Sequence, residues 1–240
     1  TRTWYFIHEE DKVKEEEDGI YRKFIEKRGE HIPLQQLTHE AYFFGMRFYV
    51  DENVLAPRPD TETLVEEVLK GLPGDQKAEI LDMCTGSGCI LLSILANREN
   101  VQGTGVDLSE KALNVARRNG RDCQIQARWI HSDLFENIRG KYDVIVSNPP
   151  YIRTSVIKGL MEEVRLHEPY MALDGHEDGL FFYRKILEQA GDYLKPDGLL
   201  AFEIGYDQGE AVFSLMKDRG YKNVKIVKDL AGLDRVVTGR

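Results

Sequence analysis

The sequence predicts an α/β protein built around a doubly wound, mostly parallel sheet. From about Lys77 onward, short apolar runs alternate with segments of helical periodicity, which is typical of parallel strands joined by crossover helices. A glycine-rich stretch, "CTGSG", separates the first apolar run from the first helical segment. The last two apolar runs, 221–230 and 234–240, are separated by "AGL" and predict an antiparallel hairpin that closes one edge of the sheet.

The individual elements of this sheet follow from the same patterns. The runs before the hairpin are short and apolar, and we expect strands at 79–84, 101–108, 127–133, 142–148 and 199–205. Together with the hairpin they predict a seven-stranded sheet. The periodic segments between them predict helices at 109–120, with Ser109 as the N-cap, at 179–194 and at 209–220.

The N-terminal part of the chain has a different pattern. Residues 1–75 predict a short helical segment, a hairpin and a linker, whereas residues 76–240 form the main domain. A charged opening run precedes an expected helix at 20–28, and alternating aromatic residues at 41–50 predict the hairpin.

The linker has the composition of a rigid segment followed by a helix. The prolines on either side of Arg58 predict an extended backbone. Asp60 or Thr61 is then expected to cap a helix. That helix ends at the helix-breaking residues Gly71, Pro73 and Gly74.

Composition limits the class of protein. The chain has neither an apolar run of about 18 residues nor a signal-peptide pattern, so we expect a cytoplasmic protein without membrane contact. Its formal net charge of -9 argues against a broad phosphate-binding surface, and no stable nucleic-acid binding is expected. Cys84, Cys89 and Cys123 lack the spacing of zinc ligands and are expected to be free thiols, without a metal site. We also expect a monomer.

The glycine-rich turn predicts an adenosine-containing cofactor. Gly86 and Gly88 lie between a strand and a helix, where the backbone must turn sharply and let a ligand approach the helix N-terminus. Asp107 follows at the end of the second strand, where its carboxylate can accept hydrogen bonds from both ribose hydroxyls. A dinucleotide fingerprint would require a third glycine, but Leu91 stands there, which disfavours NAD or FAD. A glycine turn that serves only the fold is the alternative.

Asp133 favours S-adenosylmethionine over a dinucleotide. It follows the third predicted strand, so three neighbouring strand ends would contribute to one nucleoside. Its carboxylate suits the amine of adenine, and a helix cap is the alternative role.

The stretch "VIVSNPPYI" ends the fourth predicted strand in two prolines and a tyrosine. Ligands of open parallel sheets bind at the carboxyl ends of the strands, where the strand order reverses. We expect the strand that ends at Asn148 to neighbour the first strand across that point. The residues "NPPY" would then face the methyl group of the donor.

With these residues the sequence resembles the amino methyltransferases that carry an (Asp/Asn/Ser)-Pro-Pro-(Tyr/Phe/Trp) motif. Within that group, "APRPDTETLVEEVL", the stretch "HEPYMALDGHEDGLFFYRKILEQ" after the motif, and the ending "KDLAGLDRVVTGR" are similar to the peptide chain release factor glutamine methyltransferase family. The resemblance covers residues 20–240. The sequence departs from the family at two places. At Cys84 the family usually has a glycine. Before residue 30 the family has a larger helical domain, whereas this chain has a short acidic remnant.

The resemblance implies a Rossmann-like class I methyltransferase fold and S-adenosylmethionine as the methyl donor, with S-adenosylhomocysteine as the product. It also implies a release factor as the protein partner, methylated on the glutamine of its Gly-Gly-Gln loop. The implied cofactor-binding residues are Cys84, Thr85, Gly86, Ser87, Gly88, Asp107, Leu108, Asp133, Leu134 and Asn148. The implied catalytic and substrate-binding residues are Asn148, Pro149, Pro150 and Tyr151, with Arg58 as a further substrate-binding residue.

The expected chemistry follows from the weakness of an amide as a nucleophile, because its lone pair is delocalised into the carbonyl. The side-chain oxygen of Asn148 and the carbonyl of Pro149 can each accept one N–H of the substrate carboxamide and turn its lone pair towards the methyl group. The two prolines make this geometry rigid. Tyr151 would lie against the planar amide and exclude water.

Several alternatives remain open at the level of sequence. "NPPY" alone is compatible with an inert loop, with a methyltransferase that acts on an exocyclic amine of a nucleic-acid base, or with one that acts on a ribosomal-protein glutamine. A non-catalytic nucleotide-binding factor can keep the same fold. Arg58 has an alternative role as a structural ion-pair partner within a rigid linker.

Overall fold

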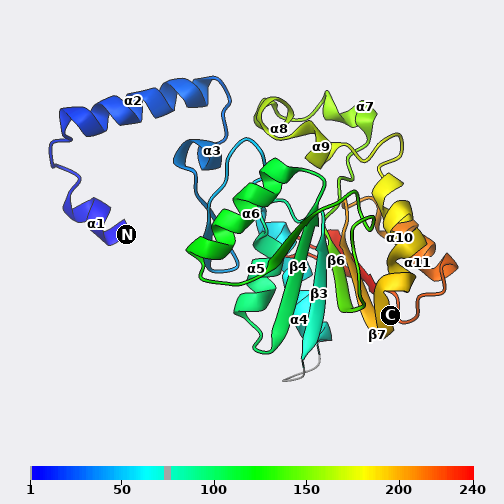
Figure 1. Cartoon of the computed structure of the whole chain (residues 1–240). Coiled ribbons are helices and arrows are strands. Elements are labelled where there is room, and N and C mark those ends of the chain that lie inside the picture. The colour runs from blue at the N-terminus through cyan, green and yellow to red at the C-terminus, as the bar shows by residue number, and fades with distance from the viewer. Residues whose placement is uncertain (1, 73–76) are drawn as a thin grey trace.

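The computed structural model of the chain describes residues 2–72 and 77–240. Its core is a seven-stranded sheet with the strand order β5-β4-β3-β6-β7-β9-β8 (Figure 1). The strands are β3 (Ala78–Met83), β4 (Val101–Asp107), β5 (Arg128–His131), β6 (Tyr142–Ser147), β7 (Leu194–Glu203), β8 (Lys225–Lys228) and β9 (Asp234–Gly239). Each predicted strand is present, which confirms the predicted sheet.

The strand directions also agree with the prediction. β3 pairs in parallel with β4 and β6, β4 with β5, and β6 with β7. β9 runs antiparallel to both β7 and β8. The order therefore reverses between β3 and β6, where Met83 lies opposite Ser147. This register brings the glycine-rich turn after β3 and the "NPPY" stretch after β6 to the same edge of the sheet.

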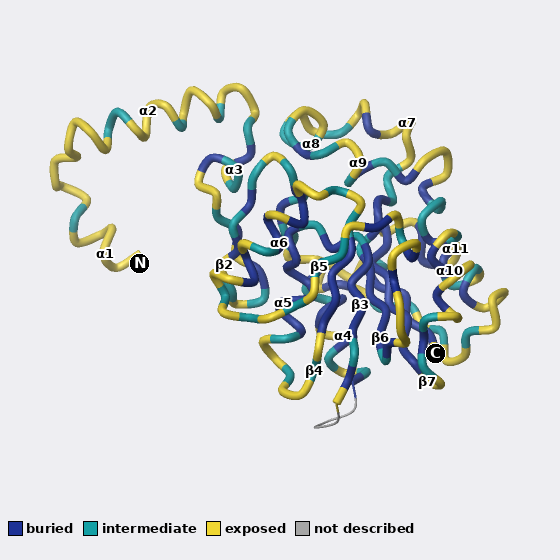
Figure 2. The backbone as a smooth tube through the Cα atoms, viewed as in Figure 1, coloured by how far each residue is buried: buried dark blue, intermediate teal, exposed yellow. Residues whose placement is uncertain are grey.

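Helices cover both faces of the sheet. The longer ones are α4 (Glu62–Gly71), α5 (Cys89–Ala96), α6 (Glu110–Asp122), α10 (Phe181–Tyr193) and α11 (Gly209–Asp218). One apolar cluster joins α4 and α5 to β3 and β6, and another joins α10 and α11 to β6, β7 and β9. Because the sheet lies between these clusters, its central strands β3 and β6 are buried on both faces (Figure 2). Such burial explains why the strand sequences are almost continuously apolar.

β7 begins earlier than the sequence predicts. Its first residue, Leu194, pairs with Tyr142, and the register then shifts before Leu199 pairs with Val144. The intervening "KPDG" consists of turn-forming residues, so the sequence pattern predicts a turn there and not a paired strand. The predicted N-cap of α6 is confirmed, since the Ser109 hydroxyl accepts a hydrogen bond from the Ala112 amide at 3.2 Å.

The N-terminal segment contains α1 (Arg2–Ile7), α2 (Glu15–Gly29), α3 (Leu34–Thr38) and a hairpin of β1 (Ala41–Phe43) and β2 (Met46–Phe48). The predicted helix at 20–28 and the predicted hairpin are both present. Neither α1 nor α2 buries a residue, and both lie to one side of the sheet (Figures 1 and 2). Within residues 2–72 and 77–240, no helix has both the length and the apolar character needed to cross a membrane.

The linker to α4 is extended at Arg58, as predicted, with φ -104° and ψ 143°. It then forms a single 3-10 turn, η1 (Pro59–Thr61). The prediction that Asp60 or Thr61 caps α4 through its side chain is wrong, because the N-cap Thr61 makes no such bond. Thr61 has helical φ and ψ and is buried, so its hydroxyl faces the protein interior. α4 ends at Gly71, whereas Pro73, Gly74 and the predicted 75/76 boundary lie outside the described residues.

Three short helices follow β6, namely α7 (Thr154–Ile157), α8 (Glu162–His167) and α9 (Tyr170–Leu173). After them the chain returns to the end of the "NPPY" stretch: Ile152 donates to Leu173 O at 3.0 Å, and Gly175 donates to Ile152 O at 2.8 Å. This pairing holds residues 169–176 beside the carboxyl ends of the central strands.

Candidate active site

A cavity of about 340 Å³ lies at the carboxyl ends of the central strands, and its size is typical of small-molecule sites. Most of the predicted site residues line it: Arg58, Cys84, Thr85, Gly86, Ser87, Asp107, Leu108, Asp133, Leu134, Asn148 and Pro150. Gly88, Pro149 and Tyr151 are not among the lining residues. The structure thus brings residues from five separate sequence segments to one site.

The glycine-rich turn forms one wall of this cavity and carries only small side chains next to its two glycines. Gly86 and Gly88 have φ values of +54° and +78°, which glycine adopts without steric cost. A Cβ on Gly88 would come within 2.8 Å of the Trp129 ring, so the turn also packs tightly on its inner side. The amide of Gly88 donates to Thr85 O at 2.8 Å, which closes the turn directly before α5.

Cys84 occupies the first position of the turn in an unusual conformation. Its φ is +60°, in the left-handed region that L-residues adopt at a cost of about 1–2 kcal/mol. This is the position where the resembling family usually has glycine, and the backbone conformation explains that preference. Burial raises the pKa of the Cys84 thiol, which favours its protonated form.

Asp107 lies at the end of β4, and its carboxylate bridges the glycine-rich turn and the start of α6. Oδ2 accepts from the Gly86 amide and Oδ1 from the Ser109 amide, each at 2.9 Å. Burial raises the pKa of Asp107, while these backbone hydrogen bonds lower it. The two oxygens of a carboxylate have about four acceptor positions, so these bonds leave the side chain able to accept from a ligand hydroxyl.

Asp133 and Leu134 complete the far side of the cavity at the end of β5. The Asp133 side chain is exposed, and Leu134 has a positive φ of +45°. No helix begins at Asp133, so its alternative role as a helix cap is not realised. Leu108 is 51% exposed at the cavity edge, where an apolar side chain is available to a planar ligand.

Asp82 is a polar residue of this site that the sequence analysis missed. It is fully buried beneath the turn, and its Oδ2 accepts from the Thr85 hydroxyl at 2.5 Å. Its Oδ1 has no hydrogen-bond partner among the described residues. Burial raises the pKa of this carboxyl to about 7, with a smaller opposing contribution from Thr85. Only its position inside an apolar strand run, "ILDM", could have identified it.

Asn148 lies directly after β6, beside Cys84 across the β3–β6 pair. The Ser147 hydroxyl donates to Met83 O at 2.7 Å and so joins the two strand ends next to the site. Asn148 is half-buried and lines the cavity, while Pro149 and Pro150 are buried. This arrangement exposes the Asn148 carboxamide to a ligand and keeps its supporting backbone inside the protein.

Tyr151 is held from several directions. Its carbonyl accepts from Gln208 Nε2 at 3.0 Å, and its hydroxyl lies 3.5 Å from Glu203 Oε1. Burial raises the pKa of Tyr151. A Cβ on Gly175 would come within 2.7 Å of the Tyr151 Cα, so the returning chain packs directly on this backbone.

Arg58 reaches the cavity from the linker. Its Nη2 donates to Glu168 Oε1 at 2.6 Å, and the Glu168 side chain is only 1% exposed. The pair joins the linker to the segment that follows α8. In the described part of the chain, no group of three or more His, Cys, Asp or Glu side chains could hold a metal ion.

Comparison with known proteins identifies the family. Residues 58–165 match the model of the methyltransferase small domain. The chain is 42% identical over 242 residues to the release factor glutamine methyltransferase of Caulobacter vibrioides, with 100% of this chain and 84% of that protein covered. It is 40% identical over 233 residues to the protein of that name from Clostridium botulinum, with 95% and 82% covered. The chain belongs to the release factor glutamine methyltransferase family. The resemblance stated from the sequence is thereby confirmed.

Solved structures with the same fold are more distant in sequence. A methyltransferase from Pyrococcus furiosus has a TM-score of 0.62 at 20% identity, with 89% of this chain and 97% of that chain covered. The T. thermophilus 16S rRNA N2 G1207 methyltransferase, solved in complex with AdoMet and guanosine, has a TM-score of 0.59 at 15% identity, with 84% and 49% covered. They confirm the methyltransferase fold of this release factor glutamine methyltransferase family member.

Sequence analysis also missed the part of the site formed by residues 169–176. Pro169, Tyr170, Met171, Ala172, Asp174 and His176 line the cavity. They belong to the stretch that the sequence analysis matched to the release factor glutamine methyltransferase family, but no local pattern predicts the pairing of Ile152 with Asp174. That pairing joins positions on the two sides of three short helices.

Proposed function

We propose that this chain transfers a methyl group from S-adenosylmethionine to the side-chain amide nitrogen of the glutamine in the Gly-Gly-Gln motif of peptide chain release factors. Membership in the release factor glutamine methyltransferase family supports this substrate, since the identity of about 40% extends over nearly the whole chain. The observation that carries the chemistry is the position of Asn148, exposed in a cavity whose opposite walls suit a nucleoside.

The residues around the cavity fit S-adenosylmethionine. In this proposal, Asp107 accepts hydrogen bonds from the ribose hydroxyls, and Asp133 accepts one from the adenine amine. The turn from Cys84 to Gly88, with two glycines and otherwise small side chains, leaves room for the methionine part of the donor. When bound, this cofactor supplies an electrophilic sulfonium methyl group and leaves as S-adenosylhomocysteine.

Asn148 and Pro149 orient and activate the substrate amide in this proposal. The Asn148 Oδ1 and the Pro149 carbonyl each accept one N–H of the glutamine carboxamide, which favours the pyramidal form of its nitrogen. Both acceptors also stabilise the positive charge that develops on nitrogen as the new N–C bond forms. The methylated nitrogen then loses one proton to water, so no general base is required before methyl transfer.

The two prolines and the tyrosine keep this geometry. Pro149 and Pro150 fix their own φ angles and contribute no N–H that would compete for the acceptors. Both prolines are buried, and they prevent the motif from relaxing away from the position required for methyl transfer. Tyr151 excludes water from the amide, and the fixed position of its carbonyl against Gln208 supports this role.

Arg58 remains a proposed substrate-binding residue at the cavity. Its ion pair with Glu168 supports an additional role in holding the linker against the segment after α8. We also propose that the enzyme acts as a monomer, and the net charge of -9 supports a protein rather than a nucleic acid as its partner.

Incubation with isotopically labelled S-adenosylmethionine tests this function. The acceptors are a purified release factor, the same factor with Gln→Ala in its Gly-Gly-Gln motif, ribosomal proteins and nucleic acid. We expect label in the unmodified factor alone. Label that enters nucleic acid or a ribosomal protein, and not the release factor, would overturn the proposal. If no label is transferred, calorimetry with S-adenosylhomocysteine shows why. Binding indicates an enzyme whose true substrate was absent, whereas no binding indicates a chain that does not use this cofactor.

A further inference from the structure

Glu203 is a buried carboxyl beside the motif that the proposed chemistry does not use. It is the last residue of β7 and is 2% exposed. Phe202 lies opposite Ser147 in the β6–β7 pair, so the next residues along these parallel strands, Glu203 and Asn148, are neighbours. Burying a carboxyl is costly because the group loses its hydration. A carboxyl buried at the ligand-binding edge of a sheet is therefore expected to have hydrogen-bonding partners or a functional role.

The side chains around the Glu203 carboxyl include hydrogen-bond donors from two parts of the chain, the linker and the "NPPY" stretch. The Tyr151 hydroxyl lies 3.5 Å from Oε1. The Thr61 hydroxyl and the Asn148 carboxamide also donate towards the carboxyl and lower its pKa. Oε2 has no hydrogen-bond partner in the described residues, and the Tyr151 contact is at the upper limit of hydrogen-bond distance. Catalytic hydrogen bonds are commonly long in a free enzyme and shorten when substrate binds.

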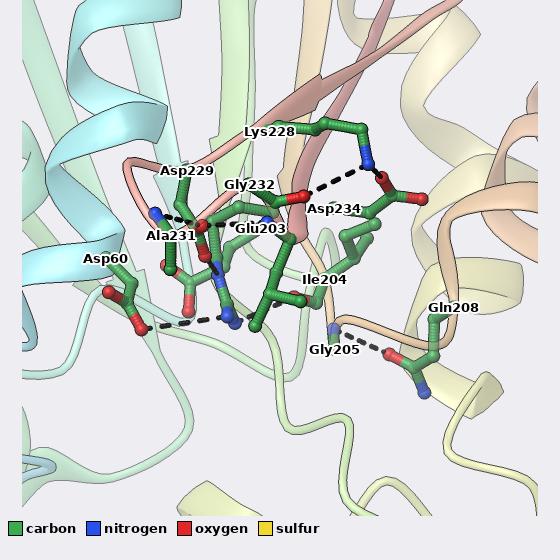
Figure 3. A network of polar contacts seen from close by, with 12 residues as sticks. Asp60, Glu203, Ile204, Gly205, Gln208, Lys228, Asp229, Ala231, Gly232 and Asp234 are labelled. Atoms are coloured by element: carbon green, nitrogen blue, oxygen red, sulfur yellow. Dashed lines mark hydrogen bonds and ion pairs between the residues drawn. The ribbon is translucent and has the colours of Figure 1, made fainter.

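Charged groups on neighbouring elements also face Glu203. Arg235 of β9 is buried and is held by Asp229 Oδ2 at 3.1 Å, by Asp60 Oδ2 at 3.6 Å and by the Ile204 carbonyl at 3.2 Å. Figure 3 shows this network around Asp60, Glu203 and Asp229. Arg235 attracts the charged form of Glu203, whereas Asp60 opposes it. The other titratable groups close to the carboxyl are Tyr151, Tyr183 and Cys89.

We propose that Glu203 is the positioning residue of the catalytic motif: it accepts a hydrogen bond from Asn148 Nδ2 and thereby turns Asn148 Oδ1 towards the substrate amide. A carboxamide presents a donor at one end and an acceptor at the other, and an ionised carboxylate can only accept. Glu203 therefore selects the orientation in which the Asn148 oxygen is free. The same carboxylate restrains the Tyr151 hydroxyl. This inference rests on the proposed function, because it gives Glu203 a role in the same methyl-transfer site.

The orientation depends on the charge of Glu203. Burial raises the pKa of Glu203 to about 7, against the opposing effects of Thr61, Arg235 and Asn148. As the pH falls through this value the carboxyl gains a proton and becomes a donor, and it can then bind the Asn148 Oδ1 that the substrate requires. We expect kcat to fall below pH 7 while the affinity for the methyl donor stays constant.

Glu203→Gln tests the inference, with Glu67→Gln as the matched control. Glu67 is a second buried glutamate, but its carboxyl is held by Lys70 and Lys225 on α4 and β8. For Glu203→Gln we expect kcat to fall about 10- to 100-fold, because small displacements of reacting groups lower rates by such factors. The KM for the donor should change little. The decline of kcat below pH 7 should disappear in this variant. Glu67→Gln should keep the wild-type kcat and its pH dependence.

The outcomes separate this inference from the proposed function. If wild-type enzyme does not methylate a release factor, the proposed function fails. If wild-type enzyme is active and Glu203→Gln keeps its kcat within threefold, the positioning role is wrong. A wild-type kcat that is constant between pH 6 and pH 8 overturns it as well, and this measurement needs no variant. Thermal unfolding and S-adenosylhomocysteine binding of Glu203→Gln show whether a low kcat arises from misfolding, in which case the wild-type pH profile decides.

Discussion

The indole ring of Trp129 lies directly against the Cα atom of Gly105, and a Cβ at position 105 would come within 2.5 Å of the ring. The same ring would be 2.8 Å from a Cβ on Gly88. Trp129 on β5 therefore occupies the space that two glycines leave, one in β4 and one in the turn. Packing against Trp129 therefore shapes the side of the glycine-rich turn that faces away from the cavity.

Gly105→Ala should destabilise the protein through this contact. The added methyl group cannot be accommodated without displacement of the Trp129 ring, and we expect a loss of about 1–3 kcal/mol in the free energy of unfolding. Gly191→Ala in α10 is the control, since nothing lies within 4 Å of its Cβ position; it should raise stability by about 0.5–1 kcal/mol. Urea unfolding of both variants measures the difference, and equal stabilities would contradict the packing described.

Cys84→Gly should stabilise the protein, although it removes a side chain. The φ of +60° costs an L-residue about 1–2 kcal/mol, and part of this is offset by the greater freedom of glycine in the unfolded chain. We expect a net gain of up to about 1 kcal/mol in unfolding free energy. Cys84→Ala keeps the Cβ and should show no gain. A Cys84→Gly protein less stable than Cys84→Ala would show that the thiol contributes more than the backbone conformation costs.

Asn148→Ala should leave the fold intact and reduce turnover. It removes one acceptor directed at the substrate amide, and the loss of one such preorganised hydrogen bond lowers kcat by about two to three orders of magnitude. Single-turnover methyl transfer to a release factor gives the rate, and binding of S-adenosylhomocysteine gives the integrity of the cavity. Near-normal methyl transfer by a folded Asn148→Ala protein would falsify the proposed mechanism.

Asp82→Asn should change how stability depends on pH. Burial raises the pKa of Asp82 to about 7, above its value near 3.9 in an unfolded chain. The folded state therefore binds this proton more tightly, and the resulting stability is present at low pH and is lost as the pH rises towards 7. The variant lacks this loss, so its stability relative to wild type should rise by about 1–3 kcal/mol between pH 5 and pH 8. Chemical unfolding at both pH values measures it, and a parallel shift at the two values would contradict the assignment.

The fold could be predicted from sequence to a large extent, because the strands and helices of the main domain have strong local patterns. Asn148 and Cys84 were placed side by side from the topology rule for parallel sheets alone, and β3 and β6 do pair there. The early start of β7 was missed because "KPDG" has turn-forming residues within the paired segment.

The polar residues behind the site were not predictable, because they depend on contacts between distant segments. Thr61 had the composition of a helix cap, and only the packing of α4 on the sheet turns its hydroxyl towards Glu203. Glu203 stands inside an apolar run, "LLAFEIG", where a single carboxylate gives no indication of its partners. Arg235 lies far along the chain from the motif it approaches.

The position of β9 has a consequence for the order of folding. β9 pairs with β7 in the interior of the sheet, while β8, which precedes it in sequence, lies at the edge. β8 can therefore join the sheet only together with β9. Arg235 lies on β9, so its charge comes close to Glu203 only when this pair of strands has joined the sheet.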